Sequence, residues 1–98
     1  MTISTYISLL NWTNQGIKNI KEAPQRLDAF KKEAEAAGGK VSGYYLTMGK
    51  YDAVLIVECP SDEAAATLIL MGGSQGNVRT RTMKAFTEDQ FRNIIAEV

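Results

Sequence analysis

The pattern of apolar and polar positions divides the first half of the chain into a strand and a helix. β-branched and aromatic residues are dense in residues 4–12, which predicts a strand. In residues 17–37 apolar side chains recur every three or four positions, which predicts a helix with one apolar face. Pro24 lies inside this pattern and predicts either a kink or the start of the main part of the helix. Gly38 and Gly39 predict its end.

The second half of the chain contains two further strand patterns, a helix and a fourth strand. Residues 40–48 and 51–59 predict the two strands. Residues 60–73 predict a helix with Ser61 as its N-cap, and residues 77–86 predict the fourth strand. The segment from Thr87 onward predicts a short final helix, because Thr87 and Gln90 have the spacing of a capping box.

This order, βαββαβ with a short C-terminal helix, predicts a ferredoxin-like α+β sandwich. Two helices would cover one face of a four-stranded antiparallel sheet. The chain contains no linker, low-complexity segment or repeat, so we expect a single domain over residues 1–98. The uncovered face must be exposed to water or covered by another subunit. Because apolar residues lie on both faces of the central hairpin, we expect a homo-oligomer, most simply a two-fold dimer.

The stretch "LTMGKYDAVLIVEC" predicts how that hairpin pairs. A type II′ turn at Gly49-Lys50 would join strands that end at Met48 and Tyr51. One face, mostly core, then carries Met48/Tyr51, Leu46/Ala53, Tyr44/Leu55 and Ser42/Val57. The other face, suited to a subunit interface enclosing a cavity, carries Thr47/Asp52, Tyr45/Val54, Gly43/Ile56 and Val41/Glu58. A bulge at Gly49 would exchange the two assignments.

Composition and charge exclude several classes of function. Eleven basic residues balance eleven acidic residues, so no overall field attracts nucleic acid or an anionic membrane. The third strand also lacks the aromatic pattern of an RNA-recognition module. With no histidine and a single cysteine, Cys59, the chain offers no metal site and no internal disulfide, and we expect no cofactor. Lacking a signal-peptide pattern and a membrane-length apolar segment, the chain is expected to be soluble and cytoplasmic.

Asp52 is the candidate catalytic residue, because a carboxylate whose pKa is raised by partial burial can act as a general base or anchor a ligand. Asp52 also lies beside a turn, where aspartate commonly accepts hydrogen bonds from backbone amides. Arg79 and Arg81 share one strand face. They can bind a carboxylate with two parallel hydrogen bonds, pair with an acid across an interface, or form a solvated edge. The candidate ligand-binding residues are Tyr45, Tyr51, Asp52, Glu58, Arg79 and Arg81.

Three segments, "TYISLLNWTNQGI", "GKYDAVLIVE" and "GNVRTRTMKAFT", resemble the GYD family of small bacterial and archaeal proteins. The glycine, tyrosine and aspartate of the family name would be Gly49, Tyr51 and Asp52. The resemblance implies a ferredoxin-like protomer that pairs sheet to sheet as a dimeric α/β barrel. It implies no activity, because proteins with related barrels include enzymes and plain ligand binders.

Two functional hypotheses follow. The first is an oligomeric binding or regulatory module, which holds a small molecule in an inter-subunit cavity or acts by assembling. The second is a cofactor-independent enzyme, similar to a monooxygenase or an isomerase, acting on a small acidic or aromatic substrate. In it Asp52 would be the base, and an arginine or tyrosine would hold the anion. We favour the first hypothesis, because the sequence contains no catalytic constellation.

Overall fold

The computed structural model describes residues 3–98 and confirms the ferredoxin-like α+β sandwich. A 3₁₀ turn at Ile20–Glu22 separates the first two helices. The other elements are β1 (Ser4–Trp12), α1 (Asn14–Lys18), α2 (Ala23–Ala36), β2 (Lys40–Leu46), β3 (Ala53–Cys59), α3 (Asp62–Ser74), β4 (Val78–Ala85) and α4 (Glu88–Ala96). Within the described range, no helix has the length and apolar character needed to cross a bilayer.

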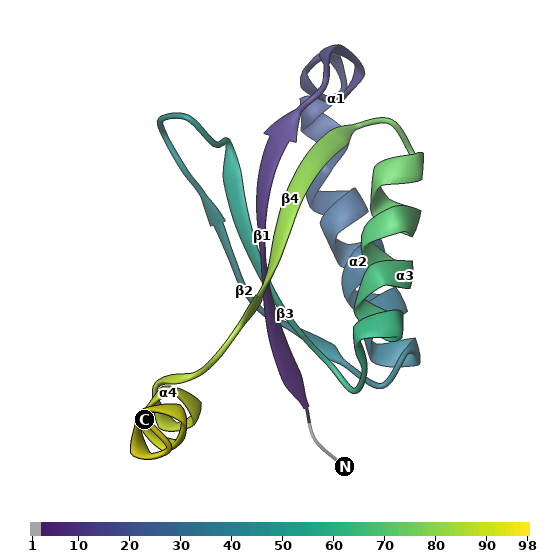
Figure 1. Cartoon of the computed structure of the whole chain (residues 1–98). Helices are drawn as coiled ribbons and strands as arrows, with labels where there is room; N and C mark the ends of the chain where they lie inside the picture. Colours follow the sequence, from purple (N-terminus) through teal and green to yellow (C-terminus); the bar gives the residue numbers. More distant parts are fainter. Residues whose placement is uncertain (1–2) are drawn as a thin grey trace.

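The four strands form one antiparallel sheet in the order β2-β3-β1-β4. Figure 1 shows α2 and α3 side by side against one face of this sheet. The C-terminal helix α4 lies beyond the end of β4, apart from the other helices (Figure 1). The opposite face of the sheet therefore has none of the helices of the described residues over it.

Local capping signals set the helix boundaries. The helical pattern of residues 17–37 is divided, and Pro24 lies in the first turn of α2, so it marks a helix start rather than a kink. Ser61 caps α3 by accepting a hydrogen bond from the amide of Ala64 at 3.1 Å, as predicted. The predicted capping box of Thr87 and Gln90 is present at the start of α4.

The predicted hairpin register is confirmed in its middle and wrong at both ends. The pairs from Leu46/Ala53 to Gly43/Ile56 form as predicted. A bulge then shifts β2, so that Val41 pairs with Val57 and Lys40 with Glu58. At the other end the ladder stops at Leu46 and Ala53, and a longer connection replaces the two-residue turn. Its glycine, Gly49, has the positive φ that the turn hypothesis required, 140°.

Hydrogen bonds of Thr47 account for this wider connection. Its amide donates to the carbonyl oxygen of Asp52 at 2.9 Å, and its hydroxyl donates to the carbonyl oxygen of Tyr51 at 2.6 Å. Thr47 therefore joins the two ends of the β2–β3 connection, in place of the predicted pair of Met48 and Tyr51. Met48 was predicted to face the core but is 99% exposed. Figure 1 shows this end of the hairpin projecting away from the helices.

The core lies between the sheet and the two long helices. The covered face of β3 is apolar and buried, as predicted for Ala53, Leu55 and Val57. Cys59 is also buried, as predicted. Ser8 is the one buried polar side chain among the described residues, and its hydroxyl lies 2.6 Å from the hydroxyl of Thr82. This pair satisfies both hydroxyl groups under the helices.

Candidate functional site

The face of the sheet opposite α2 and α3, here called the open face, carries the apolar surface of interest. Strand pairing aligns its side chains in rows. The two central rows contain Tyr45, Val54, Leu9 and Arg81, then Gly43, Ile56, Ile7 and Met83. Tyr45 is 62% exposed and Met83 is 49% exposed. Six of these eight residues have large apolar or aromatic side chains, so the centre of the open face is an apolar surface.

Asp52 lies at one end of the open face, where it ties the β2–β3 connection to the end of β1. Its carboxylate accepts hydrogen bonds from the backbone amide of Trp12 at 2.9 Å and from the side chain of Asn11 at 3.3 Å. Asn11 also donates to the carbonyl oxygen of Lys50 at 3.0 Å. These contacts support the structural role that aspartate often has beside turns. A catalytic or anchoring role for Asp52 stays a prediction.

Glu58 lies at the opposite end of the open face, paired in the sheet with Thr5 and Lys40. Its carboxylate is 3.9 Å from the Lys40 ammonium. In this ion pair the Lys40 side chain is 67% exposed and the Glu58 side chain is 32% exposed. Asp52 and Glu58 are separated by most of the length of β3, roughly 20 Å at the rise of a strand. The two acids therefore cannot act on the same small ligand within one chain.

Arg79 and Arg81 both point to the open face from the edge strand β4, as predicted from their spacing. The ion pairs formed among residues 3–98 include neither of them. Together with Asn11 they line a broad, shallow depression along β4. Tyr51 does not join this face, because it lies outside the paired strands, with the Lys50 ammonium 5.8 Å from the centre of its ring.

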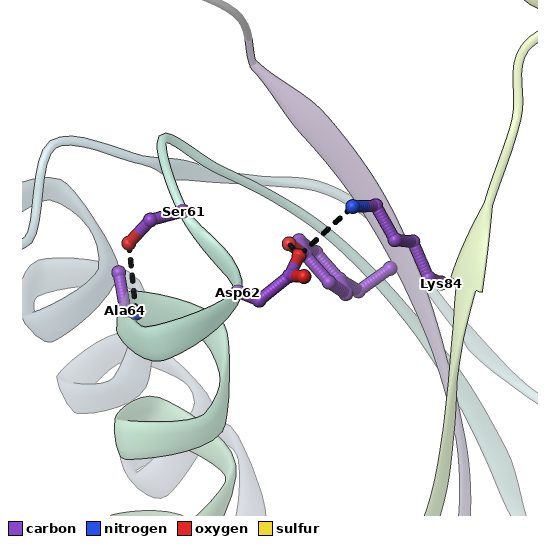
Figure 2. A network of polar contacts seen from close by, with 5 residues as sticks. Ser61, Asp62, Ala64 and Lys84 are labelled. Atoms are coloured by element: carbon purple, nitrogen blue, oxygen red, sulfur yellow. Dashed lines mark hydrogen bonds and ion pairs between the residues drawn. The ribbon is translucent and has the colours of Figure 1, made fainter.

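A network that sequence reasoning missed joins three elements at the start of α3 (Figure 2). The Tyr6 hydroxyl donates to the Asp62 carboxylate, and the Lys84 ammonium lies 3.0 Å from the same oxygen. The hydrogen bond from Tyr6, aided by the one from Lys84, lowers the pKa of Asp62. Burial, with Asp62 adding to it, raises the pKa of Tyr6 to about 12.

This network is suited to fastening α3 to the sheet and not to proton abstraction, because Tyr6 stays protonated at neutral pH. Tyr6 lies on β1 and Lys84 lies on β4. No short-range signal connected them with Asp62, since Tyr6 and Asp62 are 56 positions apart. Only the crossover of α3 over the sheet brings the three side chains together.

The resemblance of three sequence segments to the GYD family is confirmed by a match over most of the chain. A sequence profile of the GYD domain matches residues 6–95. The chain belongs to the GYD family. A protein of similar length from Thermus thermophilus is 32% identical over 82 residues, which span 83% of this chain and 86% of that protein. It is named "Glutamine synthetase and cystathionine beta-lyase binding protein".

Solved structures confirm the fold of this GYD domain. MtbAldR superimposes with a TM-score of 0.69 at 14% identity over 87% of this chain. The leucine response regulatory protein of Mycobacterium tuberculosis superimposes with a TM-score of 0.64 at 21% identity over 86% of this chain. This chain spans about half the length of those two proteins, 52% and 51%.

Proposed function

We propose that this GYD-family protein is a binding module that pairs with a second copy of itself through the open face and acts by binding another protein. The observation that carries the proposal is the apolar centre of the open face, which no element formed by residues 3–98 covers. In a protein of this size a surface of this kind usually marks an interaction site.

The occupant of the open face is a second copy of the chain. The C-terminal helix α4 supports this choice, because it presents exposed apolar side chains to solvent at Phe91 (56%), Ile94 (45%) and Ile95 (52%). It has no buried residue. A helix of nine residues is marginal without tertiary contacts. In a two-fold pair, the open faces cover each other and each α4 gains a surface on the partner.

The charges of the open face fit this arrangement. Arg79 and Arg81 lie toward one end, and Glu58 lies at the other. Facing sheets related by a two-fold axis can place the arginines of one copy near acidic groups of its partner, which would fix the orientation of the pair. Tyr45, Asp52, Glu58, Arg79 and Arg81 are the proposed lining of the interface and of any small-molecule site within it, whereas Tyr51 lies outside the open face.

The proposed binding partner is a metabolic enzyme. The relative that is 32% identical is named for its binding to glutamine synthetase and cystathionine beta-lyase. Because the two chains match over most of their lengths, we propose that this protein binds enzymes of the same two classes. We also propose a cytoplasmic location, which the buried free thiol of Cys59 supports.

The test uses the purified protein with purified glutamine synthetase and cystathionine beta-lyase from its own organism. We expect sedimentation to show a dimer at low micromolar concentration, and surface plasmon resonance to show saturable binding to at least one enzyme. Ile7→Lys, in the centre of the open face, should give a folded monomer, because a charge is costly to bury there. Leu70→Lys is the matched control, because Leu70 is 72% exposed on α3, on the other side of the sheet.

The two parts of the proposal fail separately. A monomeric parent protein overturns the pairing through the open face. A parent dimer that binds neither enzyme at about 100 μM, where even weak specific complexes form, overturns the protein-binding role.

A further inference from the structure

A second site, independent of the open face and of the proposed assembly, lies under the helices. A pocket of about 100 Å³ separates the covered face of the sheet from α2 and α3. Small residues at three lining positions, Ala23, Ala29 and Gly72, leave this space unfilled. The rest of the lining is mainly apolar and includes Leu27, Phe30 and Ile69.

Arg26 gives this apolar pocket a single strong donor. Its Nη1 donates to the carbonyl oxygen of Asn19 at 3.0 Å, which orients the guanidinium group. Its Nη2 is buried and has no hydrogen-bond partner within residues 3–98. None of the ion pairs in this part of the chain involves Arg26. A buried charged donor without an acceptor is costly, so an acceptor is expected beside it.

Tyr44 supplies a second polar group to the same pocket from β2. Tyr44 and Arg26 both line the pocket, and burial raises the pKa of Tyr44 while the positive charge of Arg26 acts in the opposite direction. A guanidinium and a phenol hydroxyl that line one pocket are suitable donors for a carboxylate. The apolar remainder of the pocket then favours a hydrocarbon group for the rest of the ligand.

Size and charge narrow the class of ligand. An apolar cavity of about 150 Å³ binds benzene, which has six carbons, so this pocket of about 100 Å³ suits a body of about four carbons. Glu33 also lines the pocket, but it follows Arg26 by two helical turns, about 10 Å along α2. The ammonium and carboxylate of an α-amino acid are on adjacent carbons, so they cannot reach Glu33 and Arg26 at the same time. We propose that this pocket binds a small branched monocarboxylate, with Arg26 holding the carboxylate and the apolar lining holding the hydrocarbon.

Three probes of the same shape test this site by nuclear magnetic resonance titration of the isotope-labelled full chain. Isovalerate should bind saturably and shift the amide signals of Leu27, Phe30 and Ile69. Valine differs by one amino group and isoamyl alcohol by loss of the carboxylate, and both should bind at least roughly tenfold more weakly. Valine binding as tightly as isovalerate overturns the monocarboxylate class, and an equally tight alcohol overturns the role of Arg26.

Two pairs of variants complete the test. Arg26→Met should weaken isovalerate binding by roughly ten- to a hundredfold, while Lys32→Met, which removes an exposed charge from the same helix, should leave it within about twofold. Gly72→Leu should abolish binding, because a Cβ there lies 3.8 Å from the Phe30 ring and its side chain would fill the pocket.

Gly73→Leu is the control for the filling variant, since a Cβ at Gly73 meets no atom within 4 Å. If Arg26→Met does not fold, the comparison of Gly72→Leu with Gly73→Leu still tests whether isovalerate binds in this pocket. Equal binding by Gly72→Leu and Gly73→Leu would overturn the pocket as the site. So would the absence of saturable shifts for the parent up to about 10 mM isovalerate.

Discussion

At the scale of single residues, Asp52 joins two segments that are distant in sequence. Its carboxylate accepts from Trp12 and Asn11, while its own amide donates to the carbonyl oxygen of Leu10 at 2.8 Å. Asp52 therefore links the segment between β2 and β3 to β1 through both its backbone and its side chain. Both side-chain hydrogen bonds end on a single carboxylate oxygen, Oδ2.

Replacing Asp52 separates a structural role from a role in binding. Asp52→Asn keeps one acceptor oxygen but loses the charge, so it should lower the free energy of unfolding by about 0.5 to 1.5 kcal/mol. Binding to the partner enzyme should not change. Asp28→Asn is the control, because it makes the same change at an exposed position of α2, on the other side of the sheet. Urea unfolding and surface plasmon resonance on the same samples measure both effects. Unchanged stability with lost binding would assign Asp52 to the site instead.

The Tyr6–Asp62 pair predicts a dependence of stability on alkaline pH. The pKa of Tyr6 is raised from 10.0 to about 12 in the folded protein, so folding favours the protonated phenol. Its contribution is complete below pH 10 and is lost as the pH rises toward 12. The stability advantage of the parent over Tyr6→Phe should therefore shrink across this interval in urea unfolding curves. A difference that stays constant from pH 9 to pH 11 would contradict the raised pKa.

Some residues could be predicted from their immediate neighbours and others could not. Ser61 and Thr87 were identified because a cap depends on an amide three residues away. The acceptor role of Asp52 was one of two alternatives, since the sequence cannot show that Trp12 provides the amide. Arg26 gave no signal, because its unsatisfied nitrogen exists only once Asn19, the sheet and the helices enclose it.

At the scale of elements, the entry into β2 depends on a close approach between two backbones. A Cβ added at Gly39 would lie 2.1 Å from the carbonyl oxygen of Glu58. The sequence predicted a glycine here for ending a helix, whereas the structure shows that absence of a side chain is what this position requires. The bulge at the start of β2 was missed for a related reason, because it depends on how the strand enters the sheet.

The close approach of the two backbones at Gly39 predicts that adding a side chain there lowers stability, whereas adding one at Gly73 does not. Gly39→Ala should destabilise the fold by about 1 to 3 kcal/mol, because the backbone of β3 must move to admit the methyl group. Gly73→Ala, within α3, should change stability by at most about 1 kcal/mol, and in the favourable direction, because alanine is the better helix former. Thermal unfolding of both variants measures the difference. Equal melting temperatures for the two would show that the strands can separate at Gly39 without cost.

At the scale of the whole molecule, the order of elements was enough to predict the architecture. Four strands and two crossover helices have few arrangements that keep crossovers right-handed and connections short. The same reasoning required something to cover the open face, but one sequence cannot show which molecule does so. The position of α4, beyond the end of β4, also could not be predicted, because its apolar side chains are exposed and pack on no other element of the described part of the chain (Figure 1).

The two outer strands have a consequence for how large an assembly can grow. The edge strand β2 is interrupted by its bulge, and the edge strand β4 carries Arg79, Arg81 and Lys84. Bulges and charged side chains both discourage another chain from adding its own strand at an edge. Growth by strand addition, which would lead to open-ended fibres, is therefore disfavoured at both sides of the sheet. The proposed face-to-face pair would therefore be a closed particle of fixed size, even when the protein is abundant.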